Sequence, residues 1–305
     1  MIMKELVREI VEEDIHTIKE LLCIVFGNGA FMRIKRLGGL TNRSYKVTRN
    51  DFLEYLVRIP GEGTEHMINR LDEKKSTELA CDLCIDSELL YFDEDGKKVM
   101  RFIKDPLPMN EAVMRKPENI QQAAKIFRKL HSCGKDTGVR FEVFEMASLY
   151  EQLILDANVC LYEDYSEIKK EVMEIKAAVD TTEKSSRVPC HNDCLVGNWV
   201  LDHTGRLYLI DWEYSGMNEA MWDLSCLSIE AEYTEENDVE LLNAYWNREA
   251  TLDEWKSFVA HKVYVDYLWS LWGLTRVPFD GVFMQTYANT RYKRLKQHIE
   301  EYKKL

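Results

Sequence analysis

The chain has 305 residues, of which 46% are hydrophobic and 30% charged, and its formal net charge is −13. This length allows two lobes or domains, and the composition is that of a globular protein. The acidic excess argues against nucleic acid as a partner, because backbone binding depends on clustered lysines and arginines. No apolar run reaches the roughly 18–20 residues of a membrane-spanning helix, so we expect no membrane insertion.

Residues 1–16 form an acidic amphipathic segment that predicts a helix and has no apolar core of the kind a signal peptide requires. We therefore expect a cytoplasmic protein. Cys81 and Cys84 have CxxC spacing, but no second pair of cysteines or histidines completes a zinc site. Their stretch reads as helical, so we interpret them as structural thiols and expect the cysteines to be reduced.

Residues 31–60 alternate in hydrophobicity or carry β-branched and aromatic side chains, with breaks at Gly38–Gly39 and at residues 49–51. This pattern predicts antiparallel strands. An apolar periodicity predicts a helix from about Glu65 to Cys84. Two further strands, residues 87–92 and 97–103, flank a DEDG turn.

Beyond a short hinge at residues 105–108 the pattern becomes helical, and Pro117 suits the first turn of a helix. The exception is residues 188–210, which predict a loop, a strand, a turn and a second strand. We predict an α+β fold with two lobes: a β-rich lobe over residues 1–104 and a mainly helical lobe, holding one β-hairpin, over residues 105–305.

The strongest motif has the form HxDxxxxN followed by IDxE, at His191, Asp193, Asn198 and Asp211. Phosphoryl transfer from ATP depends on positioning and charge neutralisation. Asp193 could accept the proton of an attacking hydroxyl. Asn198 and Asp211 flank the predicted hairpin, where their oxygens could converge on Mg²⁺.

This motif resembles the catalytic loop and metal-binding segment of the protein-kinase-like fold, in the branch of aminoglycoside phosphotransferases and choline/ethanolamine kinases. The resemblance spans most of residues 30–300 and is closest to bacterial choline kinases. It implies that His191 braces the loop, that Asp193 is the base, and that Asn198 and Asp211 bind Mg²⁺ with ATP as co-substrate.

The first lobe offers residues for the nucleotide between the lobes. Glycines in a turn let backbone amides approach phosphates, and an arginine at the end of a strand can grip phosphate oxygens. A carboxylate from the following helix should orient that arginine; we choose Glu73 and leave Glu78 open. A hinge strand would offer backbone groups to adenine. The nucleotide-binding residues are therefore Gly38, Gly39, Thr41, Asn42, Arg58, Glu73, Arg101 and Ile103.

Trp269 and Trp272 are three residues apart and share a helix face with Asp266, one turn earlier. Tryptophan faces attract cations, and aromatic cages recognise quaternary ammonium groups. Packing in a core is the alternative for such a pair. The pair resembles the C-terminal tryptophans of choline kinases, and this resemblance adds Tyr214, Glu230, Tyr233 and Tyr287 to the acceptor site.

Two features depart from the family. Trp212 replaces the more usual phenylalanine, and residues 141–187 show no family pattern. We predict an enzyme that phosphorylates the hydroxyl of choline with ATP, its partners being ATP and a small cationic amino alcohol. Ethanolamine, another amino alcohol or an aminoglycoside are alternative acceptors, and an inactive nucleotide-binding module is an alternative of another class.

Overall fold

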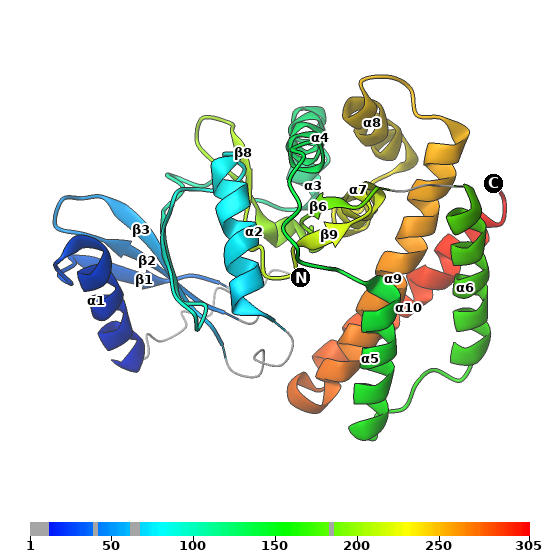
Figure 1. Cartoon of the computed structure of the whole chain (residues 1–305), viewed down its shortest axis with the longest axis horizontal. Coiled ribbons are helices and arrows are strands. Elements are labelled where there is room, and N and C mark those ends of the chain that lie inside the picture. Colours follow the sequence, from blue (N-terminus) through cyan, green and yellow to red (C-terminus); the bar gives the residue numbers. More distant parts are fainter. Residues whose placement is uncertain (1–11, 39–41, 62–67, 183–185) are drawn as a thin grey trace. The chain divides into compact units, whose positions relative to one another are not determined.

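The computed structural model describes residues 12–38, 42–61, 68–182 and 186–305 (Figure 1). The chain forms two compact units. The first contains Met1–Met109 and Asn198–Tyr214, and the second contains Asn110–Gly197 and Ser215–Leu305. The predicted class holds, since one unit carries the large sheet and the other is mainly helical.

The first unit is built on a five-stranded antiparallel sheet with the order β1-β2-β3-β5-β4. Alternate side chains of the central strands, such as Tyr45 and Val57, are buried against apolar residues of helix α1. This follows from the period of two in a strand, which sends every second side chain to the same face. The strands are β1 (Arg33–Arg36), β2 (Arg43–Thr48), β3 (Glu54–Ile59), β4 (Leu89–Phe92) and β5 (Lys98–Arg101), and α1 is Glu12–Phe26.

A buried carboxylate fixes α1 to the sheet. Asp14 accepts hydrogen bonds from Arg43 at 2.8 Å and from the hydroxyl of Tyr45. Burial, and then the Asp14 carboxylate, raise the pKa of Tyr45 to about 12. Since buried charges are stable only when paired, this contact sets where α1 packs.

Helix α2 (Arg70–Asp82) begins at Asn69, whose side chain accepts from the backbone of Leu71. The hairpin of β7 (Trp199–Leu201) and β8 (Leu207–Leu209) also belongs to the first unit. Its backbone is bonded to residues of that unit: the amide of Leu107 donates to Leu201, and that of Leu209 donates to Ile85. Chain order alone assigns this hairpin to the helical region, but these bonds tie it to the sheet-bearing unit.

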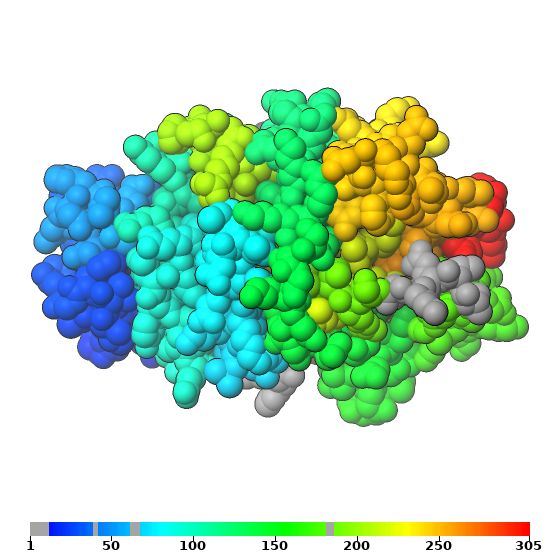
Figure 2. All heavy atoms as spheres, turned by 45° about the horizontal axis from the view of Figure 1, so that its top comes forward, coloured from blue at the N-terminus to red at the C-terminus, as the bar shows by residue number. Residues whose placement is uncertain are grey.

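The second unit is a helical assembly in which α9 and α10 form a long antiparallel pair, with α5 and α6 against α9 (Figure 1). Helix α4 lies against α8, as the green and yellow-to-orange atoms show in Figure 2. The helices are α3 (Glu111–Met114), α4 (Pro117–His131), α5 (Val143–Asp156), α6 (Tyr165–Thr182), α7 (Ala220–Glu230), α8 (Glu235–Trp246), α9 (Leu252–Asp280) and α10 (Val282–Tyr302).

The predicted helix start at Pro117 is confirmed, since Pro117 occupies the first turn of α4. The region that showed no family pattern contains α5 and α6. Tyr165 of α6 contacts Tyr267 of α9 through their hydroxyls, 2.9 Å apart. These helices therefore support the back of the helix that carries the tryptophan pair.

The eight cysteines form no disulfide in this structure. Cys23, Cys84 and Cys160 are exposed, whereas Cys190, Cys194 and Cys226 are buried. The thiol of Cys81 donates to the carbonyl of Ser87, and burial raises its pKa to about 12. Among the described residues, no helix combines the length and the apolar character that crossing a membrane requires.

Candidate active site

The loop that carries His191 and Asp193 is anchored by one buried carboxylate of α7. This loop follows β6 (Val188–Cys190), which pairs with β9 (Gly216–Asn218) in the second unit. Asp223 is 0% exposed, and it accepts hydrogen bonds from the backbone amides of His191 and Asn192, both at 2.8 Å. Two main-chain donors on one carboxylate hold the loop in a single conformation.

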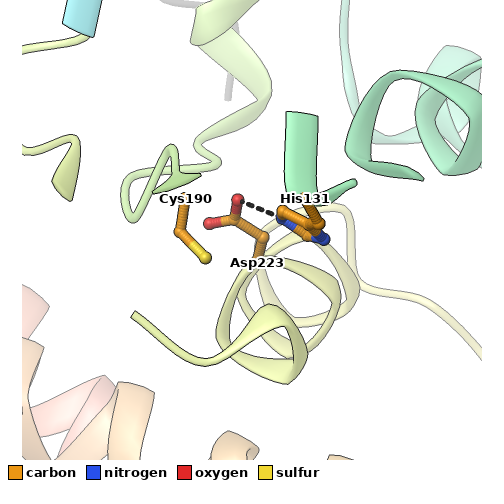
Figure 3. Close-up of side chains that lie close together, drawn as sticks. All are labelled: His131, Cys190 and Asp223. Atoms are coloured by element: carbon orange, nitrogen blue, oxygen red, sulfur yellow. Dashed lines mark hydrogen bonds and ion pairs between the residues drawn. The ribbon is translucent and has the colours of Figure 1, made fainter. Parts of the chain in front are cut away.

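A histidine completes the environment of Asp223. Figure 3 shows His131 beside the Asp223 carboxylate, with Cys190 on its other side. Nε2 of His131 lies 3.1 Å from Asp223, and Nδ1 lies 3.0 Å from the hydroxyl of Tyr245. Burial alone would raise the pKa of Asp223, but the bonds and charges from His131 and His191 outweigh it and hold the pKa below its usual range.

His131, Cys190 and Asp223 are close enough together to be considered as metal ligands. Their environment favours a hydrogen-bonded brace instead. Both oxygens of Asp223 already accept backbone amides, and burial raises the pKa of the Cys190 thiol well above its usual value. A thiol must be deprotonated to bind a metal, so the desolvated Cys190 is a poor ligand.

The backbone of the loop is left-handed at Asn192, where φ is 69°. Asparagine is among the few residues with a side chain that adopt this region readily. The side-chain oxygen of Asn192 accepts a hydrogen bond from the side chain of Asn218 at 2.9 Å. The backbone carbonyl of Asn192 accepts from the indole N–H of Trp222 at the same distance. His191 and Asp193 lie on either side of this turn, and the backbone amide of Asp193 donates to Nδ1 of His191 at 3.2 Å.

In the first unit, Asn198 and Asp211 flank the open end of the β7–β8 hairpin. Trp199 pairs with Leu209, and the amide of Ile210 donates to the carbonyl of Asn198 at 2.9 Å. Asp211 has a positive φ of 67°. The pairing thus brings together one amide and one carboxylate, oxygen donors of the type that a hard divalent cation prefers. The residues present therefore fit a divalent metal ion.

Arg58 sits in a network of buried charges. It pairs with Glu73 at 2.5 Å and with Asp211 at 3.2 Å. Of the two carboxylates that the sequence left open, Glu73 is the one that contacts Arg58. Burial alone would raise the pKa of Glu73, but Arg58, followed by Lys98, holds it below its usual value. Glu73 therefore remains an anion and orients Arg58.

A second carboxylate of the IDxE segment reaches the glycine turn. Glu213 accepts from Asn42 at 3.0 Å and lies 3.4 Å from Arg70. Burial, and then the nearby Asp211, raise the pKa of Glu213. Asn42, predicted for the nucleotide, thus connects the start of β2 to the residues that follow the hairpin.

The other residues predicted for the nucleotide belong to the glycine segment before β2 and to the end of β5. Gly39 and Thr41 lie outside the described residues, and a Cβ added at Gly38 would meet open space. Arg101 ends β5, where its side chain bonds to Glu88 and to the hydroxyl of Tyr55. Ile103 follows two residues later, beyond the end of the strand.

In the second unit, three of the predicted acceptor residues form an aromatic cluster. The ring centroids of Trp269 and Trp272 are 5.9 Å apart, and those of Trp272 and Tyr287 are 5.8 Å apart, both edge to face. Gly273 makes this possible, because a Cβ there would come within 2.8 Å of the Tyr287 ring. The cluster lies in the same unit as Asp193, whose charge helps to raise the pKa of Tyr287 after burial and Glu230.

The two carboxylates predicted for the acceptor are paired with arginines. Glu230 accepts from Arg291 at 2.5 Å. Asp266 is fully buried and accepts from Arg291 at 3.2 Å and from Arg294 at 2.7 Å. The prediction of Asp266 as a direct contact of the acceptor therefore meets a difficulty, since its oxygens are already engaged inside the protein.

The remaining residues predicted for the acceptor are Tyr233 and Tyr214. The hydroxyl of Tyr233 donates to the carbonyl of Met114 at 3.3 Å, and burial raises its pKa. Tyr214 is half-buried and belongs to the first unit, at the end of the segment that contains Asp211.

Sequence reasoning missed three residues that organise the site. Asp223 and Arg291 are charges within otherwise apolar helix faces, and such a position is itself a signal that a buried partner exists. His131 ends a strongly amphipathic helix, α4, on its buried side. Their partners come from residues far away in the chain, so spacing alone could not identify them.

The chain has the protein-kinase-like fold. The spectinomycin phosphotransferase APH(9)-Ia shares this fold with a TM-score of 0.64, over 95% of this chain and 98% of that chain, at 12% identity. The aminoglycoside phosphotransferases thus relate to this chain by fold alone.

Closer relatives are kinases of another branch. A family model described as choline/ethanolamine kinase matches residues 33–302, so the chain belongs to this family. A choline/ethanolamine kinase family protein from Mesorhizobium loti is 32% identical with a TM-score of 0.81, over 93% of this chain and 94% of that one. The choline kinase LicA from Streptococcus pneumoniae is 29% identical with a TM-score of 0.81, over 95% and 100%. This protein is accordingly a kinase whose acceptor is an alcohol, and such a kinase acts with a divalent metal ion.

We predict that Asp223→Asn lowers both stability and turnover. The asparagine side chain has one oxygen, so it cannot accept both hydrogen bonds that the backbone N–H groups of His191 and Asn192 donate to the two oxygens of Asp223. An unsatisfied buried donor costs about 1–3 kcal/mol. Denaturant unfolding and steady-state kinetics would measure the two effects. Asp253→Asn, an exposed change on α9, is the control.

The same variant has a pH signature. The pKa of Asp223 is lowered in the folded protein, so its stabilisation is present above the unfolded value of about 3.9 and is lost as the pH falls through the folded value. The free energy of unfolding should therefore depend less on pH in this acid range for the variant. An unchanged dependence would contradict the role of this carboxylate.

Proposed function

We propose that this kinase transfers the γ-phosphoryl group of ATP to the hydroxyl of choline, giving phosphocholine and ADP. Family membership supports the kinase chemistry, and the observation that carries the choice of choline is the aromatic cluster of Trp269, Trp272 and Tyr287. Faces of tryptophan and tyrosine attract quaternary ammonium groups, with each contact contributing roughly 0.5–2 kcal/mol. Because the reaction consumes ATP, we propose that it takes place in the cytoplasm.

In this proposal Asp193 is the general base. The choline hydroxyl attacks the γ-phosphorus in line, its proton passes to the Asp193 carboxylate, and the bond from phosphorus to the β,γ-bridging oxygen breaks to release ADP. His191 supports the base through the bond from the Asp193 amide to its ring. The hydrogen bonds from the backbone amides of His191 and Asn192 to Asp223 hold the loop that carries the base in place.

Asn198 and Asp211 would hold the metal, which we propose to be Mg²⁺, and the ion would neutralise phosphate charge. Arg58, oriented by Glu73, would add a guanidinium toward the phosphates. The backbone amides of Gly38 and Asn42 would approach the phosphates, and the backbone from Arg101 to Ile103 would face the adenine. Glu213 supports this group by holding Asn42 and Arg70.

The function is tested by ATP consumption with choline, ethanolamine and aminoglycosides as acceptors, each product being identified by mass spectrometry. We expect choline to have the highest kcat/KM. A preference for ethanolamine would replace the acceptor but keep the chemistry. ATP turnover with none of them would contradict the proposed function.

We predict that Asp193→Asn abolishes turnover while ATP still binds, because the amide cannot accept the hydroxyl proton. Kinetics and a nucleotide-binding titration would separate the two effects. The exposed Asp253→Asn change provides the matched control. Turnover close to that of the unmodified enzyme would remove Asp193 from its assigned role.

We predict that Trp269→Ala raises the KM for choline roughly threefold to thirtyfold, the equivalent of one cation–π contact, and changes the KM for ATP little. Trp255→Ala on the same helix is the control, since Trp255 packs on Phe258 away from the cluster. Equal increases in both KM values for Trp269→Ala would indicate a packing role.

A further inference from the structure

One arginine joins the elements around the aromatic cluster. Arg291 of α10 is only 4% exposed, and it donates to Glu230 of α7 and to Asp266 of α9. The centre of its guanidinium group also lies 4.6 Å from the centroid of the Tyr287 ring. A single side chain therefore contacts three of the residues that the sequence assigns to the acceptor.

The negative charges beside the cluster are matched by positive ones. Arg294 donates to both oxygens of Asp266 at 2.7 Å, and His298 lies 3.5 Å from the same carboxylate. Glu230 and Asp266 thus face two guanidinium groups. The anionic charge of this group is compensated inside the protein before any acceptor binds.

This compensation matters because ammonium groups differ in what they need on leaving water. A primary ammonium has three N–H donors, and each must find an acceptor when it is buried. A quaternary ammonium has no N–H donor, and aromatic faces are sufficient to hold it. A carboxylate whose charge is already offset by arginine attracts a primary ammonium less strongly, and a quaternary ammonium does not require it.

We propose that Arg291 is a positioning residue that sets the preference of the enzyme for a fully methylated ammonium over a primary one. It does so by engaging Glu230, so that the charged nitrogen of the acceptor meets aromatic faces in place of a free carboxylate. The inference rests on the proposed function and adds the residue that determines selectivity at the same site.

Arg291 also positions the ring that it covers. Its guanidinium lies over Tyr287, while Gly273 leaves space for an edge of the same ring. Tyr287 is therefore held between α9 and its own helix, with its edge-to-face contact to Trp272 maintained. Arg291 therefore both pairs with the charge of Glu230 and orients the ring of Tyr287. Substitutions of Arg291 that keep or remove its charge can separate these two effects.

The test compares kcat/KM for choline and for ethanolamine in Arg291→Gln and Arg291→Lys. The glutamine variant releases the charge of Glu230, so the ratio should move toward ethanolamine by about fivefold or more. The lysine variant keeps the positive charge but loses the planar fork, so its ratio should stay within about twofold of the unmodified enzyme. The KM for ATP should change little in either variant.

A ratio that is the same in both variants and in the unmodified enzyme would overturn the proposal, because a purely structural arginine lowers both activities together. If Arg291→Gln does not fold, Glu230→Gln gives the second test. It leaves the guanidinium groups of Arg291 and Arg294 with one carboxylate, Asp266, and this surplus positive charge near the acceptor should raise the KM for choline about fivefold or more. An unchanged KM would overturn the proposal. An unmodified enzyme that turns over neither amine would instead contradict the proposed function.

Discussion

The hydrogen bonds from the backbone amides of His191 and Asn192 to the Asp223 carboxylate are the constraint on which the second unit depends. They fix the main chain of the loop, and Asn192 allows its left-handed turn. The carboxylate is fully buried, and a buried charge is tolerated only when it is paired or hydrogen-bonded. His131 supplies a further bond and is itself held by Tyr245. The position of the loop that carries Asp193 is thus set by α7 and α4.

In the first unit, buried charges are paired through side chains and not through backbone amides. Arg58, Glu73 and Asp211 form a chain of buried or partly buried charges that joins β3, α2 and the end of the hairpin. Such a network is costly to desolvate and strongly destabilising to break, so it fixes geometry more than it adds stability. In both units, buried charged side chains that are bonded to partners hold the residues assigned to the chemistry. The same holds for Arg291, which is bonded to Glu230 and Asp266.

Local patterns in the sequence predicted the sheet, the helix starting at Pro117 and the hairpin after Asn198, because each depends on near neighbours. They could not decide between Glu73 and Glu78, since that choice requires the register of α2 against β3. Nor could they find the pairing of Arg291 with Glu230, which joins residues of two helices far apart in the chain. The spacing predicts that Asp266 shares a helix face with the tryptophan pair, but it could not predict the arginines of α10 that bond to it.

The free cysteines have a practical consequence for spectroscopy. Cys190, Cys194 and Cys226 are buried with raised pKa values, so little thiolate is available to react with a maleimide. Cys84 and Cys160 are exposed, and they belong to the first and second unit respectively. With Cys23 and the partly buried Cys81 and Cys133 replaced by serine, Cys84 and Cys160 offer one attachment point in each unit for spin labels or fluorophores. Changes in the distance between the units could then be followed during the catalytic cycle without introducing a new cysteine.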